Sequence, residues 1–274
     1  MATFTNQSKN SATFTTLLRA HPISTLSVTN KMSAIEWIAF SPDGTRLYIG
    51  DTDSPSAVHQ YSLSTAWDIT TASFVQSKTF TGTTYFESGF WKSDGTKFFA
   101  IDSDVADYIR EYTISPAWDI STASLNNSLS ITAADDSPFG LFFKSDGLKL
   151  FLTGDSSDEI NYYALSTPWD ISTAVLTSTL NISPQLSTPE GIAFNSTGTK
   201  LYVIHGITAN IAQWNLSTAW DITTASFYNY IMDTSDTSST TGLFMGQNDA
   251  TIFISDTATI KQFPLIDFTN LTKN

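Results

Sequence analysis

The chain has 274 residues, of which 41% are hydrophobic and 14% are charged, and its formal net charge at pH 7 is −13. A hydrophobic fraction of this size permits a packed core, whereas the absence of cysteine excludes disulfides and thiol chemistry. The acidic balance predicts repulsion from phosphate groups, so we expect neither a nucleic-acid partner nor insertion into an anionic membrane.

Residues 1–20 precede the repeated part of the sequence and are rich in Ser, Thr and Asn. They lack the basic and apolar regions of a signal peptide, which favours another route out of a cell, such as incorporation into a virus particle. We interpret them as an N-terminal arm. Two roles stay open for it: a disordered tail, or a segment that becomes ordered on a protein partner in a particle or oligomer.

The segment 21–29 has the chemistry of a strand that belongs to a repeat unit. Its run 24–29 (Ser-Thr-Leu-Ser-Val-Thr) matches the run 178–183 (Ser-Thr-Leu-Asn-Ile-Ser), and each begins 12 residues before a glutamate, Glu36 or Glu190. Because the second run closes a unit, the first is predicted to be the last strand of a unit, displaced to the front of the chain.

The first complete unit alternates short apolar runs with turns. The runs predict four strands, at 38–40, 47–49, 58–63 and 73–77. The sequence Ser-Pro-Asp-Gly-Thr at 41–45 is a turn signal, because Pro presets its own φ and Gly supplies a positive one. Four short strands per unit are typical of the blade of a β-propeller.

A nine-residue element, Ser-Thr-Ala-Trp-Asp-Ile-Thr-Thr-Ala, follows the third strand of the unit and occurs four times with small changes. Its tryptophans are 51 residues apart, and each precedes an aspartate: Trp67 and Asp68, Trp118 and Asp119, Trp169 and Asp170, Trp220 and Asp221. A fixed period of this size indicates a repeat architecture.

The fifth unit has its first strand at 242–245 and ends after a third strand at 260–265, without a Trp-Asp-Ile turn. It lacks a fourth strand, and segment 21–29 is a fourth strand without a unit. We therefore predict an all-β fold: a single five-bladed β-propeller of four-stranded blades over residues 21–274, whose ring is closed by an N-terminal strand that completes the last blade. Such closure removes exposed sheet edges.

The run 189–203 (Pro-Glu-Gly-Ile-Ala-Phe-Asn-Ser-Thr-Gly-Thr-Lys-Leu-Tyr-Val) resembles the blade consensus of NHL and YVTN-type propellers, and the run 38–49 resembles it equally well. The Ser-Thr-Ala-Trp-Asp-Ile-Ser-Thr-Ala element also resembles repeats of propeller proteins from marine bacteria and their phages. The first resemblance implies a propeller fold and the second implies a surface or virion protein. Neither supplies a catalytic motif, because propellers include enzymes, lectins and scaffolds.

Antiparallel strands place the loops after the first and third strands of each blade on one face and the remaining loops on the other. The second face is predicted to be acidic and to form the face for a ligand or partner. Its candidate residues stand at the ends of second strands: Asp51, Asp102, Asp155, His205 and Asp256.

Three glutamates occupy one equivalent position just before the innermost strand: Glu36, Glu87 and Glu190. Carboxylates that converge on a channel mouth supply the oxygen ligands that Ca²⁺ prefers, so these three are the candidate metal residues. Solvation, or hydrogen bonds from loop amides, is the alternative. We expect no other cofactor.

The repeated tryptophans admit two interpretations. An exposed indole on each blade could stack on a sugar ring, which would make the protein a carbohydrate-binding lectin for surface glycans. Alternatively the Trp and Ile pack against the neighbouring blade while the Asp accepts hydrogen bonds from turn amides. The second interpretation fits four near-identical copies, because every blade must solve the same packing problem.

Catalysis has little support in the sequence. No nucleophile elbow, zinc spacing or phosphate loop is present, although Asp51, Asp102 and Glu190 imitate the separated carboxylates of five-bladed glycosidases. We therefore expect a non-enzymatic structural or binding module on a virion or extracellular surface, most concretely a phage decoration or tail-associated propeller. A five-bladed lectin is the alternative, followed by a glycosidase or lactonase.

Overall fold

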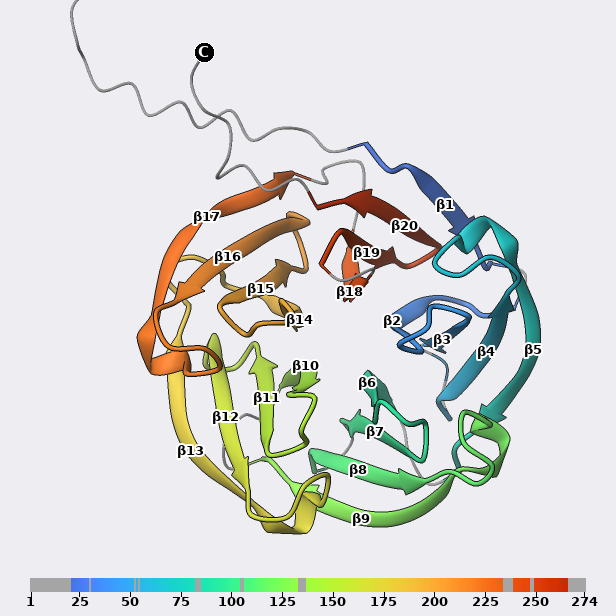
Figure 1. Cartoon of the computed structure of the whole chain (residues 1–274), viewed down its shortest axis with the longest axis horizontal. Helices are drawn as coiled ribbons and strands as arrows, with labels where there is room; N and C mark the ends of the chain where they lie inside the picture. Colours follow the sequence, from blue (N-terminus) through green and yellow to red (C-terminus); the bar gives the residue numbers. More distant parts are fainter. Residues whose placement is uncertain are drawn as a thin grey trace, which may run out of the picture.

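The structure is a computed structural model that describes residues 21–29, 31–51, 53, 55–81, 85–103, 106–132, 137–233, 239–246 and 249–265. The predicted N-terminal arm and the last nine residues of the predicted propeller lie outside the described residues. Five four-stranded antiparallel sheets surround a central axis (Figure 1), which confirms the predicted five-bladed β-propeller.

The first blade contains, from the axis outward, β2 (Ile35–Phe40), β3 (Arg46–Asp51), β4 (Ala57–Leu63) and β5 (Ala72–Thr79). Three further blades repeat this order. They are β6 (Phe86–Trp91), β7 (Lys97–Asp102), β8 (Tyr108–Thr113) and β9 (Ser124–Ser130); β10 (Pro138–Phe143), β11 (Lys149–Gly154), β12 (Glu159–Leu165) and β13 (Ala174–Asn181); and β14 (Pro189–Phe194), β15 (Lys200–His205), β16 (Asn210–Leu216) and β17 (Ala225–Asp233).

The fifth blade joins the two ends of the chain. Its inner strands are β18 (Thr240–Gly246), β19 (Thr251–Asp256) and β20 (Thr259–Pro264), and β1 (Ser24–Ser27) is its outermost strand (Figure 1). β1 pairs antiparallel with β20, Ser24 opposite Gln262, and the Ser24 hydroxyl donates to Gln262 Oε1 at 2.7 Å. This confirms the prediction that the N-terminal segment completes the last blade.

The middle of the second strand of each blade is apolar because both of its faces are buried there. In β3, Leu47 and Ile49 pack with Phe253 of the fifth blade, whereas Tyr48 packs with Phe98 of the second blade. The core is therefore a ring of five clusters between neighbouring blades, and each blade depends on both neighbours for the burial of its side chains.

A one-turn 3-10 helix follows the third strand of four blades: η1 (Ile69–Thr71), η2 (Ile120–Thr122), η3 (Ile171–Thr173) and η4 (Ile222–Thr224). In the described part of the chain these four are the helical segments. None of the described residues forms a helix that is long and apolar enough to cross a membrane.

Candidate functional site: the axial channel and its two mouths

The Trp-Asp-Ile turns hold neighbouring blades together. Asp68 begins η1, and its Oδ1 accepts hydrogen bonds from the backbone N–H of Thr70 at 3.0 Å and from the Thr70 hydroxyl at 2.6 Å. Ile69 is fully buried beside it. Asp119, Asp170 and Asp221 begin the other three turns in the same way. The aspartates therefore fold the turn, as the packing interpretation expects.

Each tryptophan of these turns packs against its own blade and the preceding one. Trp67 contacts Phe40 of its own blade and Phe244 of the fifth blade, with ring centroids 5.5 and 6.4 Å apart. The indole of Trp169 is buried, and the other three are half-buried. The contacts of the other three repeat the pattern: Trp118 with Tyr48, Trp169 with Phe99, and Trp220 with Phe142.

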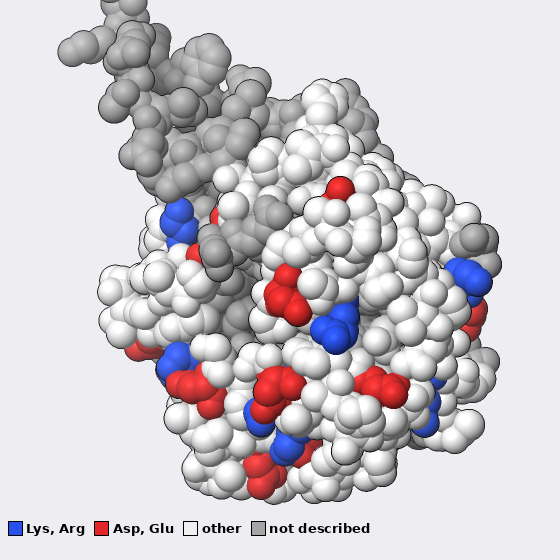
Figure 2. Space-filling model, turned by 45° about the vertical axis from the view of Figure 1, so that its right-hand side comes forward, with Lys and Arg blue, Asp and Glu red and all other residues white. Residues whose placement is uncertain are grey.

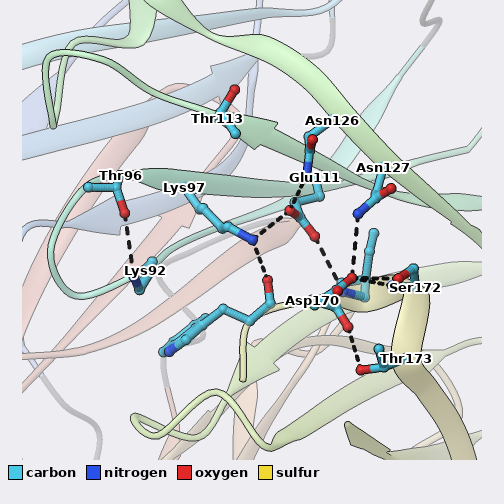
Figure 3. A network of polar contacts seen from close by, with 12 residues as sticks. Lys92, Thr96, Lys97, Glu111, Thr113, Asn126, Asn127, Asp170, Ser172 and Thr173 are labelled. Atoms are coloured by element: carbon cyan, nitrogen blue, oxygen red, sulfur yellow. Dashed lines mark hydrogen bonds and ion pairs between the residues drawn. The ribbon is translucent and has the colours of Figure 1, made fainter. Parts of the chain in front are cut away.

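The backbone of the turns is also bound to the preceding blade. Lys97 of β7 donates to the carbonyl oxygen of Trp169 and to Oε1 of the fully buried Glu111, each at 2.7 Å (Figure 3). Glu111 also accepts from Asn126 on the outer strand β9. Two of the other three turns are bound in a similar way: the Tyr48 hydroxyl donates to the carbonyl of Trp118, and Lys149 donates to that of Trp220. The turns are therefore interblade clamps.

Glu36, Glu87 and Glu190, here named the glutamate cluster, come from one position of the innermost strands β2, β6 and β14. Burial, together with the neighbouring carboxylates of Glu87 and Glu190, raises the pKa of Glu36 to about 8. Burial likewise raises the pKa of Glu190 to about 8, with Glu87 and Asp155 adding to it. The pKa of Glu87 is raised mainly by burial. The carboxylates of Glu87 and Glu190 therefore both lie near enough to Glu36 to disfavour its charged form.

The glutamate cluster does not form a three-ligand metal site as the structure places it. Among the described residues no three His, Asp or Glu side chains lie close enough together to hold one ion. Glu36 and Glu87 instead share a hydrogen bond, which requires one of the two carboxyl groups to be protonated, and the Ser103 hydroxyl donates to Glu87 Oε1. A Ca²⁺ ion at the glutamate cluster stays a prediction.

The predicted acidic face contains carboxylates that are paired inside their own blades. Asp51 is 2% exposed, and its carboxylate lies 2.8 Å from His59 Nε2 and accepts from the Ala57 N–H at 2.8 Å. Asp102 is 1% exposed and accepts from Arg110 Nε at 2.8 Å. These two carboxylates fasten the second strand of a blade to the third.

Asp256 of the fifth blade has the same arrangement. It lies 3.0 Å from Lys261 Nζ and accepts from the N–H groups of Ala258 and Thr259. These bonds, together with the lysine, lower the pKa of Asp256 against the effect of burial. A ligand would have to compete with these internal partners.

The remaining two blades depart from this pattern. Strand pairing puts Gly154, rather than Asp155, at the position of Asp51, and His205 occupies it in the fourth blade. His205 Nδ1 accepts from the N–H groups of Ile207 and Thr208, and burial lowers its pKa. Asp155 lies one residue beyond β11, close enough to Glu190 to raise its pKa.

A cavity of about 570 Å³ opens at the face that carries the Trp-Asp-Ile turns, here named the turn face. Its wall consists of the innermost strands and the four repeated tryptophans, and its rim of the turns after those strands. Phe139 and Thr241 belong to its lining, and they occupy the glutamate position in β10 and β18. This axial cavity therefore reaches from the turn face to the level of the glutamate cluster.

The sequence did not identify three residues of the cavity wall, Phe90, Phe142 and Phe244. They occupy one position of the innermost strands and stay half-exposed at the centre of the ring. The same position holds Ala39 and Ala193 in the first and fourth blades. This alternation of large and small residues at one repeat position is the signal that could have shown them.

No family model matches the chain, and no curated protein matches it. The solved structures that share its fold include the following three, at 11–14% identity. A chain of a nidogen/laminin complex has a TM-score of 0.53 at 13% identity, over 82% of this chain and 73% of that one. A candidate 6-phosphogluconolactonase from Bacteroides uniformis has a TM-score of 0.51 at 14% identity, over 86% and 69%. A functionally unknown protein from Desulfotomaculum acetoxidans has a TM-score of 0.51 at 11% identity, over 84% and 65%, so this chain spans less than two thirds of that protein's length.

These likenesses establish the fold alone. A β-propeller with repeated blades is supported, whereas membership of the NHL or YVTN type stays a prediction.

Proposed function

We propose that the protein is a non-enzymatic binding module, displayed on the surface of a particle or cell, that takes its ligand in the axial cavity. The observation that carries this proposal is the cavity itself, about 570 Å³ in volume and walled by half-exposed Phe90, Phe142 and Phe244. Concave sites of this size, mostly apolar with a few polar groups, are where proteins bind small molecules.

The acidic side chains are already bonded to basic side chains within their own blades, which supports a binding function over a catalytic one. Asp51 and Asp102, which imitate glycosidase carboxylates in the sequence, are each tied to a basic side chain of the next strand at 2.8 Å. A catalytic carboxylate has to reach substrate in the site, and these two are buried between strands of one blade.

Display on a phage particle is the most concrete form of the proposal. It is supported by the acidic charge, the Ser/Thr/Asn-rich N-terminal segment and the resemblance of the nine-residue element to phage repeats. The test compares the full chain with a chain that starts at Arg19 in co-sedimentation with virus particles purified from the source culture. We expect the full chain to sediment and the shorter one to stay in solution. If both chains stay in solution, the N-terminal segment is not a docking arm.

A lectin is the alternative within the same class, because the cavity has an aromatic wall and a rim that includes Ser93, Ser145 and Asn195. Sugars bind through stacking on aromatic rings together with hydrogen bonds to such groups. A glycan array with the full chain and with Phe142→Ala tests this. Hits that vanish in the variant would favour a lectin, and an empty array would remove it.

A lactonase is the candidate from another class. It is favoured by the fold shared with candidate 6-phosphogluconolactonases and by a buried carboxyl group, Glu36, whose pKa is raised to about 8. Perturbed carboxyl groups at a channel mouth are typical of active sites. Hydrolysis of 6-phosphogluconolactone by the wild type, and its loss in both Glu36→Gln and Glu190→Gln, would establish this activity in place of the proposed one.

A further inference from the structure

We infer that the ligand of the axial cavity is an organic cation, of the quaternary ammonium class, held by aromatic rings. This inference rests on the proposed function and specifies its ligand. Its first support is the cross-section of the cavity. One repeat position supplies Phe90, Phe142 and Phe244 from β6, β10 and β18, and Ala39 and Ala193 from β2 and β14.

The order of the blades makes this cross-section asymmetric. Phe90 and Phe142 come from neighbouring blades and touch edge to face, with centroids 5.4 Å apart. Phe244 comes from the fifth blade, which lies between the blades that carry Ala39 and Ala193 (Figure 1). The two alanines leave room on either side of Phe244, so a compact group at the axis is bounded by ring faces and edges from three directions.

The charge around the cavity favours a cation. Its described lining includes the carboxylates of Asp43 and Asp249 and no lysine or arginine. The lysines next to the rim are occupied, since Lys92 Nζ lies 2.7 Å from Asp94 and Lys144 Nζ lies 2.6 Å from Asp146. The inner end of the cavity reaches the level of the glutamate cluster, and the chain as a whole carries a net charge of −13. An anionic ligand would meet repulsion from Asp43 and Asp249, with no lysine or arginine in the lining to offset it.

The surface charge drawn in Figure 2 is mixed in sign. Figure 2 shows acidic and basic side chains next to one another on a largely uncharged surface. Pairs of this kind cancel at a distance. The negative charge of the cavity lining is that of Asp43 and Asp249 at the rim, and Asp43 also lies 3.8 Å from the Arg46 guanidinium.

The hydrogen bonds of the rim separate a quaternary ammonium from a sugar or a primary amine. Asp249 already accepts from the N–H and hydroxyl of Ser196, and Asp43 accepts from Ser41 and from the N–H and hydroxyl of Thr45. These carboxylates offer charge but little free acceptor capacity. A quaternary ammonium donates no hydrogen bond and is attracted by charge and by aromatic faces, which are the two things the cavity supplies.

The test is calorimetric titration of the full chain with benzyltrimethylammonium chloride. Choline and its uncharged counterpart 3,3-dimethylbutan-1-ol are titrated in the same way, because these two molecules have the same shape and differ only in the charge of the head group. We expect both cations to bind and the uncharged counterpart to bind at least roughly tenfold more weakly, the loss of the cation–π attraction. Binding should weaken as salt is added, because the carboxylates act through charge.

Three variants locate the site. Ala39→Phe introduces the side chain that β6, β10 and β18 already carry at that position, and it should abolish binding by filling the cavity. Phe142→Ala should weaken binding roughly tenfold. Phe74→Ala, on the outer strand β5, removes a ring that is 39% exposed and should leave binding unchanged. Thermal unfolding of each variant shows that the blade ring is intact.

The outcomes distinguish this inference from the proposed function. Equal binding of choline and 3,3-dimethylbutan-1-ol, or binding of a neutral sugar that Ala39→Phe abolishes, would overturn the cation and keep the cavity as a binding site. Cation binding that survives in Ala39→Phe would place the cation elsewhere and overturn the inference. If no cation, alcohol or sugar binds the full chain, the cavity is not a small-ligand site and both proposals fail.

Discussion

The indole of Trp67 lies directly on Gly44: a Cβ built on that glycine would be 2.3 Å from Cε2 of the ring. The backbone is joined at the same place, since the Trp67 N–H donates to the Gly44 carbonyl at 2.9 Å. Gly44 has φ +68° and Trp67 has φ 66°. The turn after the first strand and the turn after the third strand therefore form one unit on the turn face, and Gly95, Gly147 and Gly198 repeat it under the other three tryptophans.

The glycine of this unit is predicted to be required for stability. In Gly147→Ala the new Cβ would meet Trp169 at 2.4 Å on a backbone with φ +73°. Strain in the left-handed region and displacement of the indole together cost about 3 kcal/mol. The midpoint of urea unfolding measures the change. Ser145→Ala, an exposed site in the same turn, is the control and should have no effect. Equal midpoints for both variants would show that the tryptophan moves aside freely.

The glutamate cluster predicts that stability falls as pH rises. The pKa of Glu36 is raised from its ordinary value of 4.5 to about 8, so the folded chain holds a proton that the unfolded chain releases between these values. Its contribution is present below pH 4.5 and is lost as pH rises through 8. Urea unfolding at pH 5.5 and 8.5 measures this, and Glu36→Gln should flatten the profile and stabilise the protein at the higher pH by on the order of 2 kcal/mol.

A Ca²⁺ ion at the same cluster would change that profile. Cations and protons compete for carboxylates, so added CaCl₂ should raise the melting temperature at pH 8.5 and have little effect at pH 5.5. Glu190→Gln should remove the Ca²⁺ effect. Exposed Asp53 offers the control, because Asp53→Asn removes a carboxylate away from the axis. If Ca²⁺ changes the melting temperature at neither pH, the predicted metal site is ruled out.

The fold could be predicted because the information for it is local and repeated. A period of 51 residues, four turn signals per unit and an unpaired strand at each end leave few arrangements other than a closed ring. The predicted strands at 38–40 and 47–49 are longer in the structure, as β2 and β3, because Trp37 pairs with Gly50 and Ile35 pairs with Asp51 beyond a bulge. Trp91, which lies on the innermost strand β6, is 5% exposed.

The candidate site could be predicted only in part, because it depends on which side chains meet across strands. That Glu36, Glu87 and Glu190 share one position was visible in the sequence, and the structure shows that they interact. The pairing of Asp51 with His59 was not visible, since it requires the register of β3 and β4 and the direction of both side chains. A carboxylate at a strand end looks the same in sequence whether it faces solvent or a basic partner.

The carboxylate pairs predict that the loss of stability on removing a carboxylate depends on whether its basic partner is removed as well. Asp102→Gly leaves the Arg110 guanidinium, 21% exposed, without its carboxylate partner and should destabilise the protein by about 3 kcal/mol. The double variant Asp102→Gly with Arg110→Asn recreates the pair that the third blade has, Gly154 and Asn161. It should be less destabilised than the single variant, because no unpaired charge remains. Chemical unfolding of both measures the difference, and a double variant that is less stable than the single one would contradict the pairing.

The interblade clamps predict a similar contrast between two lysines. Lys97 and Lys149 begin equivalent strands, β7 and β11, and each donates to the carbonyl of a tryptophan in the next blade. Only Lys97 also neutralises a buried carboxylate, Glu111, whose place in β12 is taken by Tyr162. Lys97→Met therefore leaves an uncompensated charge and should cost about 3 kcal/mol, whereas Lys149→Met loses a hydrogen bond and should cost about 1 kcal/mol.

Chemical unfolding of the two variants at neutral pH measures this contrast, and a second substitution identifies its cause. Adding Glu111→Gln to Lys97→Met removes the unpaired charge and keeps one acceptor oxygen, whereas Asn126 and the Ile171 N–H donate to the two different oxygens of Glu111. The added substitution should restore most of the lost stability. If Lys97→Met and Lys149→Met cost the same, or if Glu111→Gln restores nothing, the buried carboxylate contributes no charge to the clamp and the hydrogen bond to the tryptophan carbonyl alone joins the blades.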